Sequence, residues 1–281
     1  AQRLTPHTLK LGHMSTQQHP AQSIWSHRII FVQFLRREIL AKHRNSVMGM
    51  AWVLVTPLLM LAVYTFVFVG VFKAKWPGME AAGGWSYAMN LFAGLTIFNF
   101  FAEVVNRAPS LLLEQPNLVK KVVFPLPLLV AVQIATGLFN LLMSWAILLV
   151  GVAVMGGLHW ETLALPLALL PLLPLLYGLG LLLSALCIYV RDLAHLVTVG
   201  VSLLLFLSPI FYTSKSLPEH LRWLLLANPL SSVIENVRAL LFNPSAFQWG
   251  AWAALFVLGI GMSVLGNWVF KKLQPGFADV I

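Results

Sequence analysis

The residues that could carry out chemistry are few, and their spacing argues against several kinds of site. A loop that cradles nucleotide phosphates has the pattern G-x-x-x-x-G-K-[ST], but the sequence contains no Gly-Lys pair. Cys187 is the single cysteine, and no H-E-x-x-H pattern occurs. We therefore expect no metal site, no cofactor and no nucleotide hydrolysis on this chain.

Two carboxylates, Glu103 and Asp192, lie beside long apolar runs. An ionisable residue within a membrane span is a functional candidate. Each lies near the end of its run, however, where it could pair with Arg107 or Arg191. We interpret both as structural, because a proton-coupled carrier would be expected to hold its carboxylates at mid-membrane.

Aromatic residues are the more informative group. Tyr64, Phe68 and Phe72 follow the i, i+4, i+8 spacing of one helix face. Aromatic faces can stack on the apolar faces of sugar rings, although such stripes also commonly face lipid or a helix core. The candidates for glycan contact along a channel are Tyr64, Phe68, Phe98, Phe101, Phe206, Phe211 and Tyr212.

The composition indicates which elements must position these residues. Of the 281 residues, 59% are hydrophobic and only 10% are charged, whereas a soluble domain carries about 25% charged residues. Several runs reach the roughly 20 apolar residues that a membrane-spanning helix needs. The fold class is therefore all-α integral membrane. The net charge of +9 indicates membrane orientation rather than nucleic-acid binding.

The chain divides into three parts: a polar extension at 1–23, an amphipathic interface helix at 24–48 and a domain of six transmembrane helices at 49–281. Two short re-entrant helices within 217–242 precede the last span, because that stretch is too polar to cross a bilayer. The six spans are expected at 50–72, 87–105, 128–155, 163–189, 193–212 and 249–270.

The segment 24–48 mixes apolar and basic residues, which favours a helix in the membrane interface over one packed only on protein. Its cations are candidates for binding the headgroup of a lipid-linked substrate at a cytoplasmic entrance. They are Arg28, Arg36, Arg37, Lys42 and Arg44.

Loop charge predicts the orientation. An even number of spans puts both termini on one side, which holds 13 of the 18 Lys and Arg residues, against 5 on the other. Basic loops stay in the cytoplasm. We therefore expect both termini to be cytoplasmic.

Several short motifs resemble one family. They include RNSVMGMAW at 44–52, NLVKKVVFP at 117–125, RDL at 191–193 and SPIFY at 208–212, with NPL at 228–230 and the tail FADVI. Together they are similar to the permeases of polysaccharide ABC exporters, the type-2 ABC membrane subunits for O-antigen, teichoic acid and capsule. The NLVKK stretch and the tail resemble the O-antigen exporters most.

This resemblance implies a homodimer in the bacterial inner membrane that moves a polyprenyl-linked or otherwise lipid-linked glycan through a channel between the subunits. Two copies of a separate ATPase, which bind ATP and Mg, would dock on its cytoplasmic side. The residues implied in coupling lie in 112–123 and near 189–194. They are Asn117, Leu118, Val119, Lys120, Lys121, Arg191 and Asp192.

Other readings stay open at this stage. The nearest is a permease that exports capsular polysaccharide or teichoic acid. An ABC permease for a drug or lipid is the next, and a neighbouring gene for a glycosyltransferase would argue against it. A membrane-embedded glycosyl- or acyltransferase needs a carboxylate or histidine constellation that the sequence does not suggest. A structural membrane scaffold would purify without an ATPase.

Overall fold

The computed structural model describes residues 28–41, 46–74, 76, 83–120, 124–214 and 217–281, and every regular element in these ranges is helical. The expected extension at 1–23 lies outside the described residues. The helices are α1 (Arg28–Ala41), α2 (Trp52–Tyr64), α3 (Gly83–Arg107), α4 (Pro116–Lys120), α5 (Pro127–Val154), α6 (Leu165–Leu169), α7 (Leu172–Tyr189), α8 (Leu193–Leu207), α9 (Arg222–Ala227), α10 (Pro229–Phe242), α11 (Trp249–Leu273) and α12 (Phe277–Val280).

Five helical stretches are long and apolar enough to cross a membrane. They are Gly49–Val71, Gly83–Ser110, Pro127–Val154, Trp160–Tyr189 and Trp249–Val280. These stretches correspond to five of the six expected spans, so the chain is a multi-pass membrane protein. The count of six stays a prediction, because the span expected at 193–212 contains the shorter helix α8.

Helix α8 ends early for a local reason. It has 15 residues, or about 22 Å at 1.5 Å per residue, which is less than the roughly 30 Å of a bilayer core. Pro209 follows, and the residue before a proline is pushed out of the helical region. Ser208 accordingly has φ −84° and ψ 147°, which are extended values. The chain from 208 onward therefore continues as an irregular segment.

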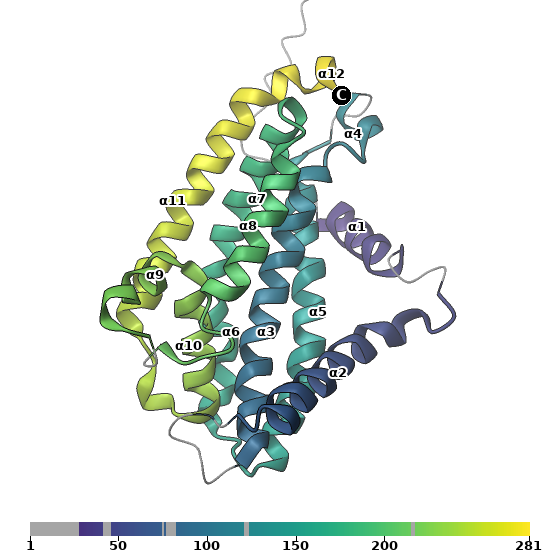
Figure 1. Cartoon of the computed structure of the whole chain (residues 1–281). Coiled ribbons are helices and arrows are strands. Elements are labelled where there is room, and N and C mark those ends of the chain that lie inside the picture. The colour runs from purple at the N-terminus through teal and green to yellow at the C-terminus, as the bar shows by residue number, and fades with distance from the viewer. Residues whose placement is uncertain (1–27, 42–45, 75, 77–82, 121–123, 215–216) are drawn as a thin grey trace, which may run out of the picture.

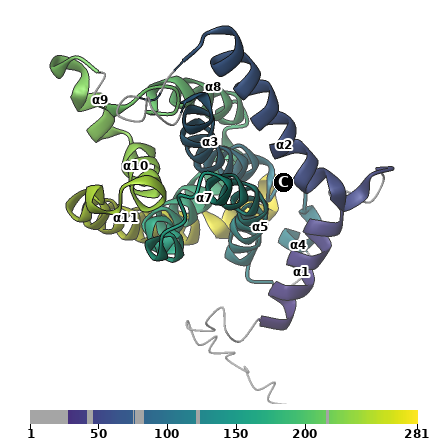
Figure 2. The same cartoon turned by 90° about the horizontal axis from the view of Figure 1, so that it is seen from below.

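The long helices form a bundle with α3 at its centre (Figure 1). In the most apolar 18-residue stretch of this span, 83% of the residues are buried. Helices α5, α7 and α10 pack around it, and α11 packs on α7. Helix α2 runs obliquely along the outside of the bundle, as the end-on view shows (Figure 2). We call the end that carries α4 and α12 the basic end, because it holds Lys120, Arg191, Lys271 and Lys272. The opposite end is called the aromatic end.

Two hydrophobic clusters hold the bundle together. The larger one runs along α3, α5, α7 and α10. The second cluster lies at the basic end and is smaller. Its buried members are Leu111, Leu112, Leu126, Leu129, Val130, Leu181, Ala185, Ile188, Phe270 and Phe277. Because these residues come from α5, α7, α11, α12 and the stretch before α4, the second cluster ties the ends of several helices together.

The segment expected to hold two short helices does contain them, as α9 and α10. Asn228 ends α9 and caps α10: its Oδ1 accepts the backbone N–H of Leu230 at 3.0 Å, and Pro229 takes the first helical position. This is the usual chemistry of a helix start. That these two helices are re-entrant stays a prediction.

The segment expected to form an interface helix contains α1, which lies beside α5 and has no buried residue (Figure 1). Its place in the membrane interface stays a prediction. Phe34 packs on Phe124 with ring centroids 5.1 Å apart, while Ile29 and Val32 are 67% and 59% exposed. One side of α1 therefore rests on protein. The other presents apolar residues that a bilayer interface could cover.

Candidate functional site

The structure brings together most of the predicted aromatic residues at the aromatic end. Phe68 and Phe211 stack with ring centroids 5.5 Å apart, and Tyr64 lies 6.3 Å from both. Phe206 stacks on Phe211 at 6.2 Å. Two further rings join them, so that the aromatic cluster consists of Tyr64, Phe68, Phe72, Tyr87, Phe206 and Phe211.

The aromatic cluster is also tied by hydrogen bonding. The Tyr87 phenol on α3 donates to the backbone carbonyl of Phe211 at 3.0 Å. The Tyr212 phenol reaches back to the carbonyl oxygens of Phe206 and Leu207, at 3.4 and 3.2 Å. These contacts hold the irregular segment after α8 against the start of α3. Phe206 itself is 69% exposed, so the cluster extends to the surface.

Phe98 and Phe101 lie elsewhere. Both are buried in the core along α3, with 7% and 3% of their surface exposed. In this conformation they lie behind the exposed face of the molecule. They therefore support the position of α3 and do not face the surface that carries Phe206.

The helix that carries Tyr64 and Phe68 changes its geometry inside the cluster. After α2 the chain continues as a π-helical stretch, Thr65–Val71. The Thr65 hydroxyl donates to the carbonyl of Leu61 at 2.6 Å. Extended π-helical turns are rare and occur frequently at functional sites.

A buried arginine that the sequence reasoning had not selected lies next to this cluster. Arg238 on α10 is 5% exposed. Its guanidinium donates to the carbonyls of Asn90 at 3.0 Å and Ile210 at 2.9 Å, and also to that of Pro209. It lies 4.5 Å from the ring of Trp76. One side chain thus connects α10, α3 and the segment after α8.

The charge of Arg238 persists despite its burial. Burial lowers the pKa of the guanidinium to about 10, and the neighbouring Glu235 carboxylate opposes that shift. The two groups are 3.5 Å apart. At neutral pH the guanidinium is therefore protonated and keeps all its donors. The signal in the sequence was a pair of charges, Glu235 and Arg238, spaced i, i+3 within an otherwise apolar run.

A second polar link joins the same elements. The Asn228 side-chain amide donates to the Ser208 hydroxyl at 2.8 Å, and this hydroxyl donates to the carbonyl of Leu204 at 2.6 Å. Asn228 and Ser208 are both buried. The end of α8 and the start of α10 are therefore connected through side chains as well as through Arg238.

At the basic end, α4 presents two different sides. Leu118 and Val119 pack against the second cluster, whereas Asn117 and Lys120 are exposed. The exposed side can meet another protein, and the buried side passes any displacement to the residues around it. Lys121, also predicted to act in coupling, lies outside the described residues.

The other predicted coupling residues lie at the same end. Arg191 and Asp192 are exposed at the break between α7 and α8. The end of α7 is tied to the end of α11, because the Tyr189 phenol donates to the carbonyl of Leu273 at 3.0 Å. The basic end therefore offers two exposed segments on a common, connected base.

Of the predicted headgroup residues, Arg28, Arg36 and Arg37 on α1 are exposed. Arg37 lies 4.7 Å from the ring of Phe34. Lys42 and Arg44 lie outside the described residues. The described cations of this group are therefore available to solvent or lipid headgroups.

Glu103 has an interaction that the sequence did not indicate. The side-chain amide of Asn140 on α5 donates to both of its carboxylate oxygens, at 2.8 and 3.0 Å. Arg107 forms its ion pair with Glu114, at 2.6 Å. A cavity of about 600 Å³ lies beside Glu103 and is also lined by Glu38 and Gln133. It is a polar recess between α1, α3 and α5.

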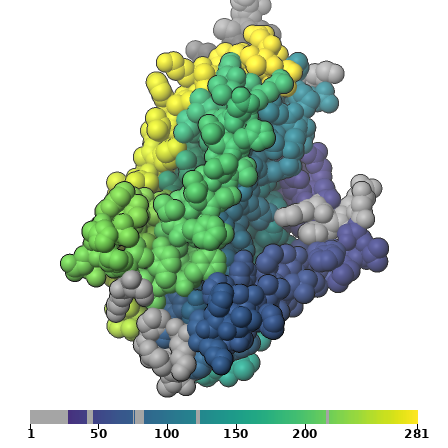
Figure 3. Space-filling view, in the orientation of Figure 1, coloured from purple at the N-terminus to yellow at the C-terminus, as the bar shows by residue number. Residues whose placement is uncertain are grey.

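Within the described ranges, no group of three or more His, Cys, Asp or Glu residues is placed to hold a metal ion. Helix α2 has no buried residue and α8 has one, Val201. The space-filling view places both on the face toward the viewer (Figure 3). The fold and this face define a multi-pass membrane protein with a large uncovered apolar side.

Comparison with known proteins identifies the class. Residues 30–242 match the ABC-2 type transporter family, and the chain belongs to that family. It is therefore the membrane permease part of an ABC transporter. It is 26% identical over 255 residues to the O-antigen export system permease protein RfbA of Klebsiella pneumoniae, which covers 90% of this chain and 95% of the relative. It is 25% identical over 263 residues to the RfbA of Myxococcus xanthus, covering 92% and 98%.

Proposed function

We propose that this chain is the permease subunit of an ATP-driven exporter of a lipid-linked polysaccharide of the O-antigen type. The proposal is supported by relatives that are O-antigen export permeases and that match about nine-tenths of the chain. The permease acts as a homodimer with two copies of a separate ATPase subunit, which binds ATP and Mg. The sequence contains no nucleotide-binding loop of the G-x-x-x-x-G-K-[ST] type, which supports placing ATP binding on the separate subunit.

The cargo path runs along the face formed by α2 and α8. These helices are the most exposed of the long apolar ones, and neither contains Asp, Glu, Lys or Arg. A second copy packed on this face would enclose a seam between two bundles. Tyr64, Phe68, Phe206 and Phe211 would line its aromatic end, where ring faces can stack on sugars without fixing one sugar in place.

The ATPase acts on the basic end. Asn117 and Lys120 offer an exposed contact, and Arg191 with Asp192 offers a second. Because Leu118 and Val119 pack on the second cluster, a push on α4 reaches the ends of α7 and α11. Nucleotide binding would in this way move helices that are connected to the whole bundle.

The cytoplasmic entrance lies at α1. Arg28, Arg36 and Arg37 carry exposed positive charge beside apolar residues, as expected for binding a pyrophosphate that is attached to a lipid. Lys42 and Arg44, which follow α1 in the sequence, are further candidates for this role. In this arrangement the protein lies in the bacterial inner membrane with both termini in the cytoplasm.

Loss of the chain tests the cargo. A strain without this protein is expected to lose its surface polysaccharide and to accumulate the lipid-linked glycan inside the cell, and the wild-type chain is expected to restore export. Mass spectrometry of extracted lipids and staining of surface polysaccharide would measure both. If surface polysaccharide is unchanged while another lipid is no longer exported, the proposed cargo is wrong.

A single labelling experiment tests the orientation. The native cysteine, Cys187, is 1% exposed and will not react with a polar reagent. A Lys120→Cys variant should therefore be labelled only when the reagent reaches the cytoplasmic side. Labelling of intact cells by an impermeant maleimide would contradict the proposed contact with an ATPase. Trp249→Cys lies at the other end of the bundle, so the impermeant maleimide should label this variant in intact cells.

A further inference from the structure

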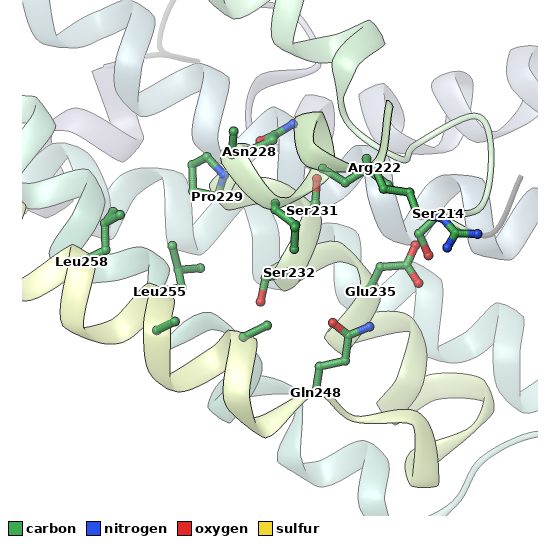
Figure 4. A pocket seen from close by; sticks show the side chains of 15 residues that line it. Ser214, Arg222, Asn228, Pro229, Ser231, Ser232, Glu235, Gln248, Leu255 and Leu258 are labelled. Carbon is green, nitrogen blue, oxygen red and sulfur yellow. The ribbon is translucent and has the colours of Figure 1, made fainter. Parts of the chain in front are cut away.

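A cavity of about 650 Å³ lies between α9, α10 and the first turns of α11. Figure 4 shows that its two ends differ in chemistry. Ser214, Arg222 and Glu235 gather at one end, whereas Leu255 and Leu258 of α11 form the other. A ligand that fills this cavity must therefore be polar at one end and apolar at the other.

The cavity opens on the surface of the molecule. Two of its lining residues, Leu226 and Leu258, are 87% and 56% exposed. The described lining residues include no aromatic ring. Aliphatic walls without a ring suit a hydrocarbon chain better than a sugar, which stacks on aromatic faces.

Two serines lining the cavity have unused hydrogen-bonding capacity. Ser231 is only 6% exposed, and Ser232 is the next residue on α10. The hydroxyls of both are buried and have no partner among the described residues. Buried hydroxyls without a partner are unfavourable, so a ligand that accepts hydrogen bonds here would gain from them.

The position of the cavity indicates which kind of molecule reaches it. Trp249 at the start of α11 and Trp223 on α9 are each 61% exposed, and such tryptophans mark the membrane–water interface. Leu255 and Leu258 follow Trp249 by six and nine residues, about 9 to 14 Å further along the helix. The cavity thus spans the boundary between lipid headgroups and acyl chains.

We infer that this cavity binds a zwitterionic phospholipid from the bilayer leaflet at the aromatic end. Arg222 and the hydroxyls of Ser231 and Ser232 bind the phosphate, and Glu235 binds the ammonium group. The start of an acyl chain lies on Leu255 and Leu258. This inference does not depend on the cargo of the exporter.

The charges around the cavity are available for such a headgroup. Arg222 pairs with Glu219 at 3.4 Å, but both side chains are more than half exposed, and such pairs are weak. Glu235 is 3.5 Å from Arg238, which lies behind it on α10. A free phosphate would use only the polar end, whereas a phospholipid would use the whole cavity.

The experiment uses the full-length chain in lipid nanodiscs and a phosphatidylethanolamine with a photoreactive group near the start of one acyl chain. Crosslinked peptides are identified by mass spectrometry. We expect crosslinks to α9 and to 249–260 of α11, and a several-fold lower yield with a matching phosphatidylglycerol probe. Ala254 lines the cavity and Ala253 does not. Ala254→Phe should therefore reduce the crosslink at least fivefold, and Ala253→Phe should leave it unchanged.

A second variant addresses the hydroxyls without filling the cavity. The double substitution Ser231→Ala and Ser232→Ala should reduce the crosslink severalfold while membrane abundance stays the same. The inference is overturned if both alanine-to-phenylalanine variants crosslink like wild type. It is also overturned if excess free phosphate or an oligosaccharide displaces the probe, or if the two headgroups crosslink equally.

Discussion

Helices α7 and α11 pack closely on each other, whereas α2 and α8 each lie largely uncovered on the outside of the bundle. A Cβ at Gly178 on α7 would overlap the backbone carbonyl of Met262 on α11, and a Cβ at Gly266 would overlap the carbonyl of Gly178. The Ser263 hydroxyl donates across the pair to the carbonyl of Pro174 at 2.7 Å. Close approach through small residues and interhelical hydrogen bonds is how membrane helices associate tightly.

Helices α2 and α8 are covered much less by the rest of the bundle. None of the residues in the most apolar part of the span Gly49–Val71, which contains α2, is buried. On α8, a Cβ added at Gly200 would meet no atom within 4 Å. One side of the bundle is therefore already complete within a single chain. The other side is apolar surface that needs lipid, cargo or a second copy to cover it.

The strongest loss of stability should follow from separating α7 and α11. Gly266→Val would force α7 and α11 apart, and overpacking costs roughly 1–3 kcal/mol or more where backbone is displaced. We expect the yield of monodisperse protein after detergent extraction to fall severalfold. Gly261→Val on the same helix is the control, because no atom lies within 4 Å of a Cβ there. Equal yields would mean that α7 and α11 are not held by these glycines.

The next effect is expected from Arg238, which connects α10 with α3 and with the segment after α8. Arg238→Met leaves the carbonyls of Pro209 and Ile210 without their donor, and each buried unsatisfied group costs about 1–3 kcal/mol. We expect the Tm of the purified chain to fall by several degrees and protease cleavage near α10 to increase. Arg222→Met removes an exposed guanidinium and should leave both unchanged. An unchanged Tm for Arg238→Met would show that α10 is held by its apolar contacts alone.

A smaller effect on stability, but a clear one on transport, is expected on the open side. Phe206 is 69% exposed, so Phe206→Ala removes little buried surface and should leave membrane abundance unchanged. Under the proposed function it should lower export severalfold, because a stacking surface of the path is lost. Trp160→Ala removes a ring that is 80% exposed but lies outside the aromatic cluster. If both variants export like wild type, the path does not run past Phe206.

The sequence predicted the elements well because each depends on local composition. Long apolar runs gave five helices of spanning length, and the Asn-Pro pair at 228–229 marked the boundary between α9 and α10. The same reasoning overestimated the length of the helix expected at 193–212, which ends at Leu207, shortly before Pro209. Hydropathy measures whether a segment suits lipid, and it does not say how much of that segment is helical.

The contacts between elements could not be predicted in this way. Arg238 binds carbonyls 148 and 28 residues away in the chain, so its role depends on which helices meet. Backbone carbonyls have no sequence signature. The glycines of α7 and α11 are visible in the sequence, but the sequence does not say which helix each of them faces. The aromatic spacing predicted Tyr64 and Phe68 on one face, but only the fold brings Phe211 to them.

The smallest effect is expected from a single exposed charge at the basic end. Lys120 lies on α4, whose apolar side is anchored in the second cluster, so Lys120→Gln should leave abundance and Tm unchanged. If α4 is the contact for the ATPase, removing this charge should lower export by no more than about fivefold, because one exposed ion pair contributes about 0–1 kcal/mol. Lys271→Gln, an exposed lysine at the same end, is the matched control. A defect that is equal in both variants would indicate general charge at the basic end rather than a contact at α4.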